Sequence, residues 1–174
     1  MGWKVQRVSS VPFAFLRGLQ QIVAVIRAGR QSTTVVIDVF STRSFIVSEV
    51  VAWLARASGL PVVLVLHGGK LVERAQRDKR RMEQLLRSAT AVVTPSKYLQ
   101  EHLRAMVGVS ATYLPNGLSI QAYPFKERGP VQPKFIWLRA LNQGYDPMTA
   151  LKALAIIVAR ESRATLVFGG PDRG

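Results

Sequence analysis

Short apolar runs alternate with helix-length segments along most of the chain. Each run ends in small or polar residues, as in Val62–Leu66, which stands between Pro61 and His67-Gly68-Gly69. An apolar run without alternation is typical of a strand buried in a parallel sheet. The runs with this layout are Thr34–Phe40, Val62–Leu66, Ala89–Val93, Ala111–Leu114, Lys134–Leu138 and Ala164–Phe168. The alternation predicts βα units and an α/β fold built on a parallel sheet.

The segments between these runs carry helical patterns. Phe45–Ala57 is apolar almost all round, which predicts a helix buried on most sides. Leu71–Arg87 has one apolar stripe at helical spacing and charge elsewhere, which predicts a single amphipathic helix. At the start of the chain, Trp3–Val8 predicts a strand that is followed directly by a helix.

Two helices have recognisable end signals. Ser96 is placed to cap a helix that Gly108 ends, because a serine oxygen accepts from the first turn and glycine adopts the left-handed conformation. Asp146 is placed to cap another, with Pro147 at its first position.

Composition limits the chemistry that the chain can perform. The 174 residues are 48% hydrophobic, which is enough for a real core, and they include no cysteine. Disulfides are excluded, and with only His67 and His102 available we expect no metal site. The longest apolar stretch, 45–66, is interrupted by Glu49, Arg56 and Pro61, so we expect no membrane span. The expected location is the cytoplasm, with peripheral binding to the inner face of the membrane as an open possibility.

The net charge is extreme, with 24 Lys and Arg against 10 Asp and Glu, or +14. Such a field attracts phosphate-bearing partners. The densest cluster contains Arg74, Arg77, Lys79, Arg80, Arg81 and Arg87. It is read either as a solvated helix face paired with neighbouring acids or as a patch that faces an anionic membrane surface. Nucleic acid is the least favoured partner, because no RNA-binding aromatic signature, helix-turn-helix spacing or zinc finger is present.

A change of composition predicts a domain boundary. Residues 123–133 contain three prolines and a glycine without periodicity, which is typical of a linker. The predicted organisation is a first domain over 1–122, the linker, and the start of a second domain over 134–174. One strand, one helix and one more strand cannot form a covered parallel sheet. We therefore expect the second domain to be truncated and the first to lack its first strand and loop.

The order of several motifs resembles a known family. These motifs are His67-Gly68-Gly69, Ala91–Ser96, Leu114–Gly117, the linker, Phe135–Arg139 and Gly169–Asp172. In this order they are similar to the GT-B glycosyltransferases of family 4. The resemblance implies two Rossmann-like domains, with helices on both faces of their parallel sheets. It implies an acceptor, a sugar or a lipid-linked molecule, on the first domain and a nucleotide-sugar donor on the second. It further implies transfer that retains the anomeric configuration, without a metal or another cofactor.

The resemblance also implies particular site residues. His67 matches a histidine that contacts the donor sugar, and we assign it the catalytic position; Arg139 matches an arginine that faces the donor diphosphate. The positions implied in substrate binding are Ser41, Gly68, Gly69, Asn116, Gly117, Gly169 and Gly170. Structural readings stay open beside these: a strand-end histidine satisfied by the backbone, an ordinary Asn-Gly turn, an arginine that extends to solvent, and serines that only cap helices.

The chain departs from the family pattern in places. Gly144 and Tyr145 stand where family members have a lysine that clamps the diphosphate, and the acidic Glu-x7-Glu region would lie beyond Gly174. We therefore expect little activity from this chain alone. The alternative hypothesis is a basic, non-enzymatic α/β module that binds anionic lipid or polyphosphate. A nucleotide-binding protein of another class is less favoured, since the Walker and Gly-x-Gly-x-x-Gly motifs are absent.

Overall fold

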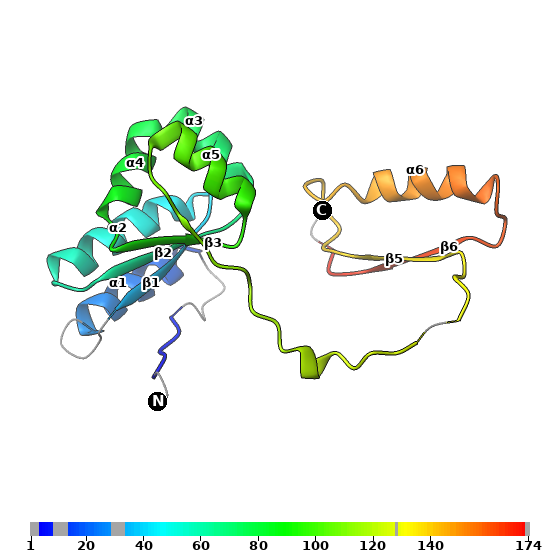
Figure 1. The fold of residues 1–174 in the computed structure, drawn as a ribbon, viewed down its shortest axis with the longest axis horizontal. Helices are drawn as coiled ribbons and strands as arrows, with labels where there is room; N and C mark the ends of the chain where they lie inside the picture. Colours follow the sequence, from blue (N-terminus) through cyan, green and yellow to red (C-terminus); the bar gives the residue numbers. More distant parts are fainter. Residues whose placement is uncertain (1–3, 9–13, 29–33, 128, 173–174) are drawn as a thin grey trace. The chain divides into compact units, whose positions relative to one another are not determined.

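The computed structural model describes residues 4–8, 14–28, 34–127 and 129–172. The chain divides into two compact units, Met1–Leu118 and Ser119–Gly174. Each unit contains its own parallel sheet with helices beside it (Figure 1). No helix in the described ranges is long and apolar enough to cross a membrane.

The first unit is built on four parallel strands. These are β1 (Val35–Val39), β2 (Val62–Leu66), β3 (Ala91–Thr94) and β4 (Thr112–Tyr113), and they lie side by side in the order β1-β2-β3-β4. The register pairs Ile37 with Leu64 and Leu64 with Val92, so β2 is held between two neighbours along its length. The predicted α/β class, a Rossmann-like parallel sheet flanked by helices, is confirmed.

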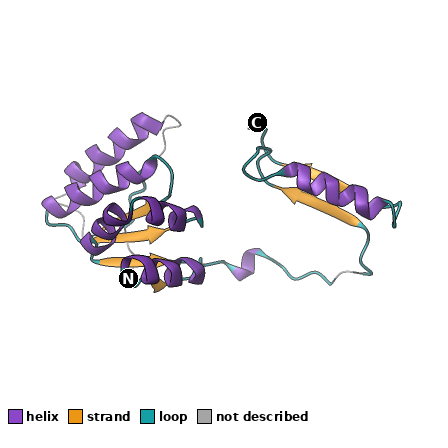
Figure 2. Ribbon diagram, turned by 90° about the horizontal axis from the view of Figure 1, so that it is seen from above, coloured by secondary structure: helices purple, strands orange, loops and turns teal. Residues whose placement is uncertain are grey.

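The described part of this unit has five helices beside the sheet: α1 (Ala14–Ala28), α2 (Ser44–Ala57), α3 (Lys70–Arg77), α4 (Lys79–Ser88) and α5 (Lys97–Val107). Successive strands are neighbours, and right-handed crossovers that all step in one direction place their helices on the same face. Helices α3, α4 and α5 lie on one side of the strands, and the same helices overlie the strands when the molecule is seen from above (Figures 1 and 2). Helix α1 packs against α2.

The core lies between the sheet and these crossover helices. Phe45 from α2, Leu71 from α3 and Leu103 from α5 are fully buried there, together with Leu64 and Leu66 from the sheet. The opposite face of the sheet is more open, and Val36 on β1 is 64% exposed. The described crossover helices, α2 to α5, cover the face of the sheet on which this core lies.

Two local predictions are corrected by the structure. The expected single helix over 71–87 is two helices, because the backbone of Asp78 leaves the helical region at φ −124° and ψ 49°. The apolar stripe continues across the break, since Ala75 and Met82 are seven residues apart and both are buried. At the other end of the unit, residues 4–8 do not form the predicted strand, and Trp3 lies outside the described residues.

The second unit contains one βαβ element. It consists of β5 (Lys134–Leu138), α6 (Pro147–Val158) and β6 (Thr165–Gly169), with β5 and β6 parallel. Asp146 caps α6 by accepting from the Thr149 N–H at 3.2 Å, and Pro147 opens the helix as the sequence predicted. The 3-10 turn η1 (Ile120–Ala122) is the only regular element described between β4 and β5.

Candidate functional site

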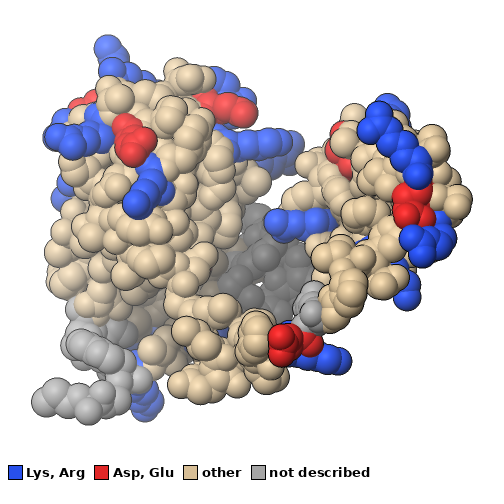
Figure 3. All heavy atoms as spheres, turned by 45° about the vertical axis from the view of Figure 1, so that its right-hand side comes forward, with Lys and Arg blue, Asp and Glu red and all other residues tan. Residues whose placement is uncertain are grey.

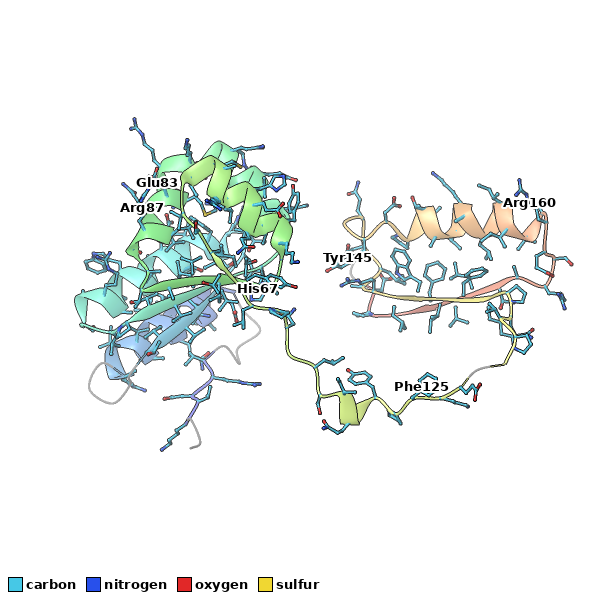
Figure 4. All side chains as sticks on the ribbon, in the orientation of Figure 1. His67, Glu83, Arg87, Phe125, Tyr145 and Arg160 are labelled. Carbon is cyan, nitrogen blue, oxygen red and sulfur yellow. The ribbon has the colours of Figure 1, made fainter. Side chains whose placement is uncertain are left out.

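His67 lies at the carboxyl end of β2 and is held there by three contacts. Its N–H donates to the Val39 carbonyl at 3.0 Å, which extends the pairing of β1 and β2 by one residue. Its Nε2 is 3.0 Å from Oδ1 of Asp38, and its ring stacks on Phe40 with centroids 5.2 Å apart and planes 18° apart. The His67 side chain, labelled in Figure 4, is 27% exposed, so solvent reaches the ring while the contacts with Asp38 and Phe40 hold its orientation.

This arrangement decides which ring nitrogen can accept a hydrogen bond. An ionised carboxylate only accepts, so the proton of the His67–Asp38 bond is on Nε2. In the neutral imidazole, Nδ1 is then the acceptor. The stacked Phe40 fixes the plane of the ring. The contacts with Asp38 and Phe40 therefore fix the orientation of the His67 ring at this edge of the sheet.

Sequence reasoning missed both Asp38 and Phe40. Asp38 precedes the buried Val39 in β1 and Phe40 follows the end of the strand, so both lie on the face opposite Val39. His67, which follows the buried Leu66, points to the same open face. The signal that the sequence offered for this contact was Asp38, a single carboxylate inside an apolar strand. Its meaning depended on the β1–β2 register, which pairs Asp38 with Val65, two residues before His67.

Gly68 and Gly69 turn the chain from β2 into α3. Gly68 has a φ of +84°, in the left-handed region that glycine adopts at little cost. The carbonyls of Gly68 and Gly69 each accept at 3.1 Å from the first turn of α3, from Leu71 and Val72 respectively. A Cβ added at either glycine would meet no atom within 4 Å, so the space above the turn is open.

Ser41 follows β1 at the same edge, and its carbonyl oxygen is held by an arginine. The Arg74 Nη1 donates to Ser41 O at 3.2 Å, and the guanidinium lies 4.1 Å above the Phe45 ring. Arg74 Nη2 is also 3.6 Å from Asp78 Oδ2, and the side chain is only 12% exposed. The sequence analysis expected Arg74 on a solvated face with acid partners; the pairing with Asp78 is observed, but the side chain is largely buried and braces the loop after β1.

The ends of β1, β2 and β3 bring three predicted residues to one edge of the sheet. Ser41, His67 and Ser96 follow adjacent parallel strands, as the sequence predicted. Ser96 Oγ accepts from the Leu99 N–H at 3.3 Å and caps α5, so its side chain serves the helix. At the far end of α5, Gly108 has a φ of +65° and ends the helix as predicted.

Asn116 and Gly117 lie in the loop after β4. Both are exposed, and neither has a positive φ, so the predicted turn conformation is not adopted. A Cβ on Gly117 would meet no atom within 4 Å. These two residues therefore have room for a ligand but are not fixed by packing.

In the second unit, Arg139 follows β5 and meets the end of β6. Its N–H donates to the Gly169 carbonyl at 3.1 Å, and its guanidinium lies 5.0 Å from the centre of the Tyr145 ring. Tyr145 is one of the two positions where the family resemblance implied a lysine. The sequence analysis did not anticipate this contact, in which the ring of Tyr145 (labelled in Figure 4) lies against the Arg139 guanidinium.

Gly170 packs directly against the backbone of Arg139. A Cβ on Gly170 would lie 1.9 Å from the Arg139 carbonyl oxygen, and its φ of +153° disfavours any other residue. Leu141 N–H donates to the Pro171 carbonyl at 2.9 Å just beyond. Arg139, Gly169 and Gly170 thus meet at the edge of the sheet in the second unit. The other group of site residues lies at the sheet edge of the first unit and consists of Ser41, His67, Gly68 and Gly69.

One carboxylate near this edge has an altered pKa. The Thr149 hydroxyl and N–H both donate to Asp146, and these bonds lower the pKa of its carboxyl. The described residues contain no group of three His, Cys, Asp or Glu side chains that could hold a metal ion.

Comparison with known protein families gives a match. A family model described as "Glycosyl transferase 4-like domain" matches residues 2–117. This range covers two thirds of the chain and includes Ser41, His67 and Asn116. A comparison with curated proteins found no match.

Proposed function

Because the chain belongs to the glycosyl transferase 4-like domain family, we propose that it takes part in transferring a sugar from a nucleotide-sugar donor to an acceptor, with retention of the anomeric configuration. The observation that carries the proposal is the oriented imidazole of His67, held by Asp38 and Phe40 at the carboxyl edge of the sheet. Ligands of open α/β sheets bind outside this edge.

The first unit supplies the acceptor side in this proposal. The Nδ1 of His67 accepts a hydrogen bond from a sugar hydroxyl, while Asp38 keeps the ring in the required tautomer. The open turn at Gly68 and Gly69 lets a sugar approach the backbone. Ser41 lines the same edge, and Asn116 with Gly117 contributes polar groups from the loop after β4.

The second unit supplies the donor side. Arg139 presents a guanidinium whose planar donors suit the oxygens of a diphosphate. Tyr145 supports the guanidinium from one side, and the Gly169–Gly170 edge lets the diphosphate approach the backbone. Transfer breaks the bond between the anomeric carbon and the diphosphate oxygen and forms one to the acceptor oxygen, whose hydroxyl proton passes to the departing diphosphate. Arg139 stabilises the negative charge that develops on the leaving diphosphate. The proposal uses no metal or other cofactor.

The test separates the two sides by residue. In titrations with labelled nucleoside diphosphates, Arg139→Ala should weaken binding by about 1.5–3 kcal/mol, the range for hydrogen bonds to charged groups. His67→Ala should leave nucleotide affinity unchanged, because His67 belongs to the acceptor side. In a transfer assay with a protein that contains this chain and a complete donor site, His67→Ala should instead lower turnover, since it removes the group that positions the sugar.

Arg160→Ala is the matched control, because Arg160 is an exposed arginine of the same unit outside the proposed site. It should change neither nucleotide affinity nor turnover. Equal nucleotide affinity in wild type and Arg139→Ala would contradict the assignment of the donor side. Binding of inorganic polyphosphate with no preference for nucleoside diphosphates would instead favour the non-enzymatic module.

A further inference from the structure

Helix α2 presents a second apolar face that the core does not use. Its inward face is buried, with Phe45 and Ala55 both 0% exposed. Ile46, Val50 and Trp53 recur at helical spacing on another side of the helix and are 51%, 38% and 66% exposed. We call these three residues the α2 row. Exposed apolar residues that form a contiguous row mark a surface for interaction.

The neighbouring helix has a similar surface. Helix α1 approaches α2 so closely that a Cβ on Gly18 would lie 3.4 Å from Val47 Cγ2. On its exposed side α1 presents a row at spacings of three and four: Leu16, Leu19, Val23 and Ile26. The adjacent helices α1 and α2 therefore both have exposed apolar side chains.

Cations without an acid partner lie on α3 and α4, and α4 contacts α2. In the basic cluster of 74–87, three arginines have acid partners: Arg74 with Asp78, Arg81 with Glu49, and Arg87 with Glu83. The other three, Arg77, Lys79 and Arg80, are exposed and form no ion pair within the described ranges. Together with Gln76, Asp78 and Arg81 they line a shallow, open surface hollow of about 370 Å³ at the junction of α3 and α4.

The Arg81–Glu49 pair joins the cations to the α2 row. Glu49 is on α2 between Ile46 and Trp53, and Arg81 binds its carboxylate with both Nε and Nη2. Helix α4 is therefore fixed next to the α2 row. Figure 3 shows Lys and Arg side chains along the upper part of the first unit, with carboxylates beside some of them.

We propose that this surface docks the first unit on an anionic lipid bilayer. Apolar side chains that include a tryptophan, next to cations without acid partners, are the combination that binds an anionic interface. Trp53 and its row enter the boundary between headgroups and acyl chains. Arg77, Lys79 and Arg80 bind the lipid phosphates. The proposal concerns where the protein is held and is independent of glycosyl transfer.

The test is sedimentation of the 174-residue chain with phosphatidylcholine vesicles, with and without phosphatidylglycerol. Binding should require the anionic lipid and weaken with salt, since exposed charges are screened over ~10 Å at 0.1 M. Arg77→Gln with Arg80→Gln should lower partitioning about fivefold for each cation removed. Trp53→Gln with Ile46→Gln should lower it as well. Because all four residues are exposed, these variants should keep the fold.

Matched controls come from the second unit. Lys152→Gln with Arg160→Gln removes two exposed cations, and Leu151→Gln with Ile156→Gln removes two exposed apolar side chains. Neither pair should change vesicle binding. Brominated lipid should quench wild-type fluorescence and should quench Trp53→Phe less.

Three results would overturn the proposal. The first is equal binding to neutral and anionic vesicles, and the second is equal loss in the control pairs. The third is a concentration-dependent dimer that forms without lipid and is abolished by Trp53→Gln, which would assign the α2 row to a second copy of the chain.

Discussion

Truncation of the Leu64 side chain in β2 should clearly lower the stability of the first unit. Its side chain is 0% exposed, and its register neighbours Ile37 and Val92 are both buried. Leu64→Ala should lower the free energy of unfolding by about 2–5 kcal/mol. We expect the upper half of that range, because β2 is hydrogen-bonded on both sides and cannot collapse into the cavity.

Amide hydrogen exchange measured by mass spectrometry is the suitable assay. It reports on each unit separately, so a change in the first unit is not averaged with the second. Exchange of peptides over β2 and β3 should accelerate by about a hundredfold or more in Leu64→Ala, since every 1.4 kcal/mol is a factor of ten. Peptides over β5 and β6 provide the internal reference.

Val36→Ala is the matched control for the opposite face of the sheet. Val36 is 64% exposed, so its truncation should cost no more than about 1 kcal/mol, the span of strand propensity. A loss from Val36→Ala as large as that from Leu64→Ala would show that the open face is packed. It would then refute the one-sided arrangement of helices.

Two further predictions concern the second unit. Gly170→Ala should cost about 1–3 kcal/mol, because its Cβ would collide with the Arg139 carbonyl oxygen and its φ of +153° strains other residues. Chemical denaturation should show this loss, and Gly117→Ala, where a Cβ meets nothing within 4 Å, should not share it. The Asp146 cap should depend on pH, because the folded-state pKa is lowered from its ordinary value of 3.8. The cap stabilises the helix fully above that value, and this stabilisation is lost as the pH falls through the lower folded-state pKa. The NMR shift of the Thr149 amide should therefore titrate in acid. An unchanged titration in Asp146→Asn would exclude this carboxyl as the cause.

The local structure of this chain could be predicted from short stretches of sequence. The strand at Val62–Leu66, the cap at Ser96 and the helix end at Gly108 all match the prediction. Each depends on residues within a few positions of one another, so the sequence pattern contains the required information. The alternation of these elements also determined the parallel sheet, because βα units permit few arrangements.

Side-chain partners across the sheet were decided by the tertiary structure. His67 was found from its place at a strand end, but Asp38 and Phe40, which orient it, are 29 and 27 residues earlier. Arg74 looked like one exposed cation among several, yet it packs on Phe45 and holds the loop of Ser41. Such contacts depend on strand register and helix rotation, which a local pattern does not specify.

The faces of the helices and sheet were decided in the same way. The sequence showed that 45–57 is apolar on nearly every side, but not that the α2 row would stay exposed. Likewise, the stripe over 71–87 keeps its spacing through the break at Asp78, so periodicity alone cannot show two helices. Hydrophobicity determines which residues favour burial, whereas the order of strands and the hand of their crossovers determine which face is covered.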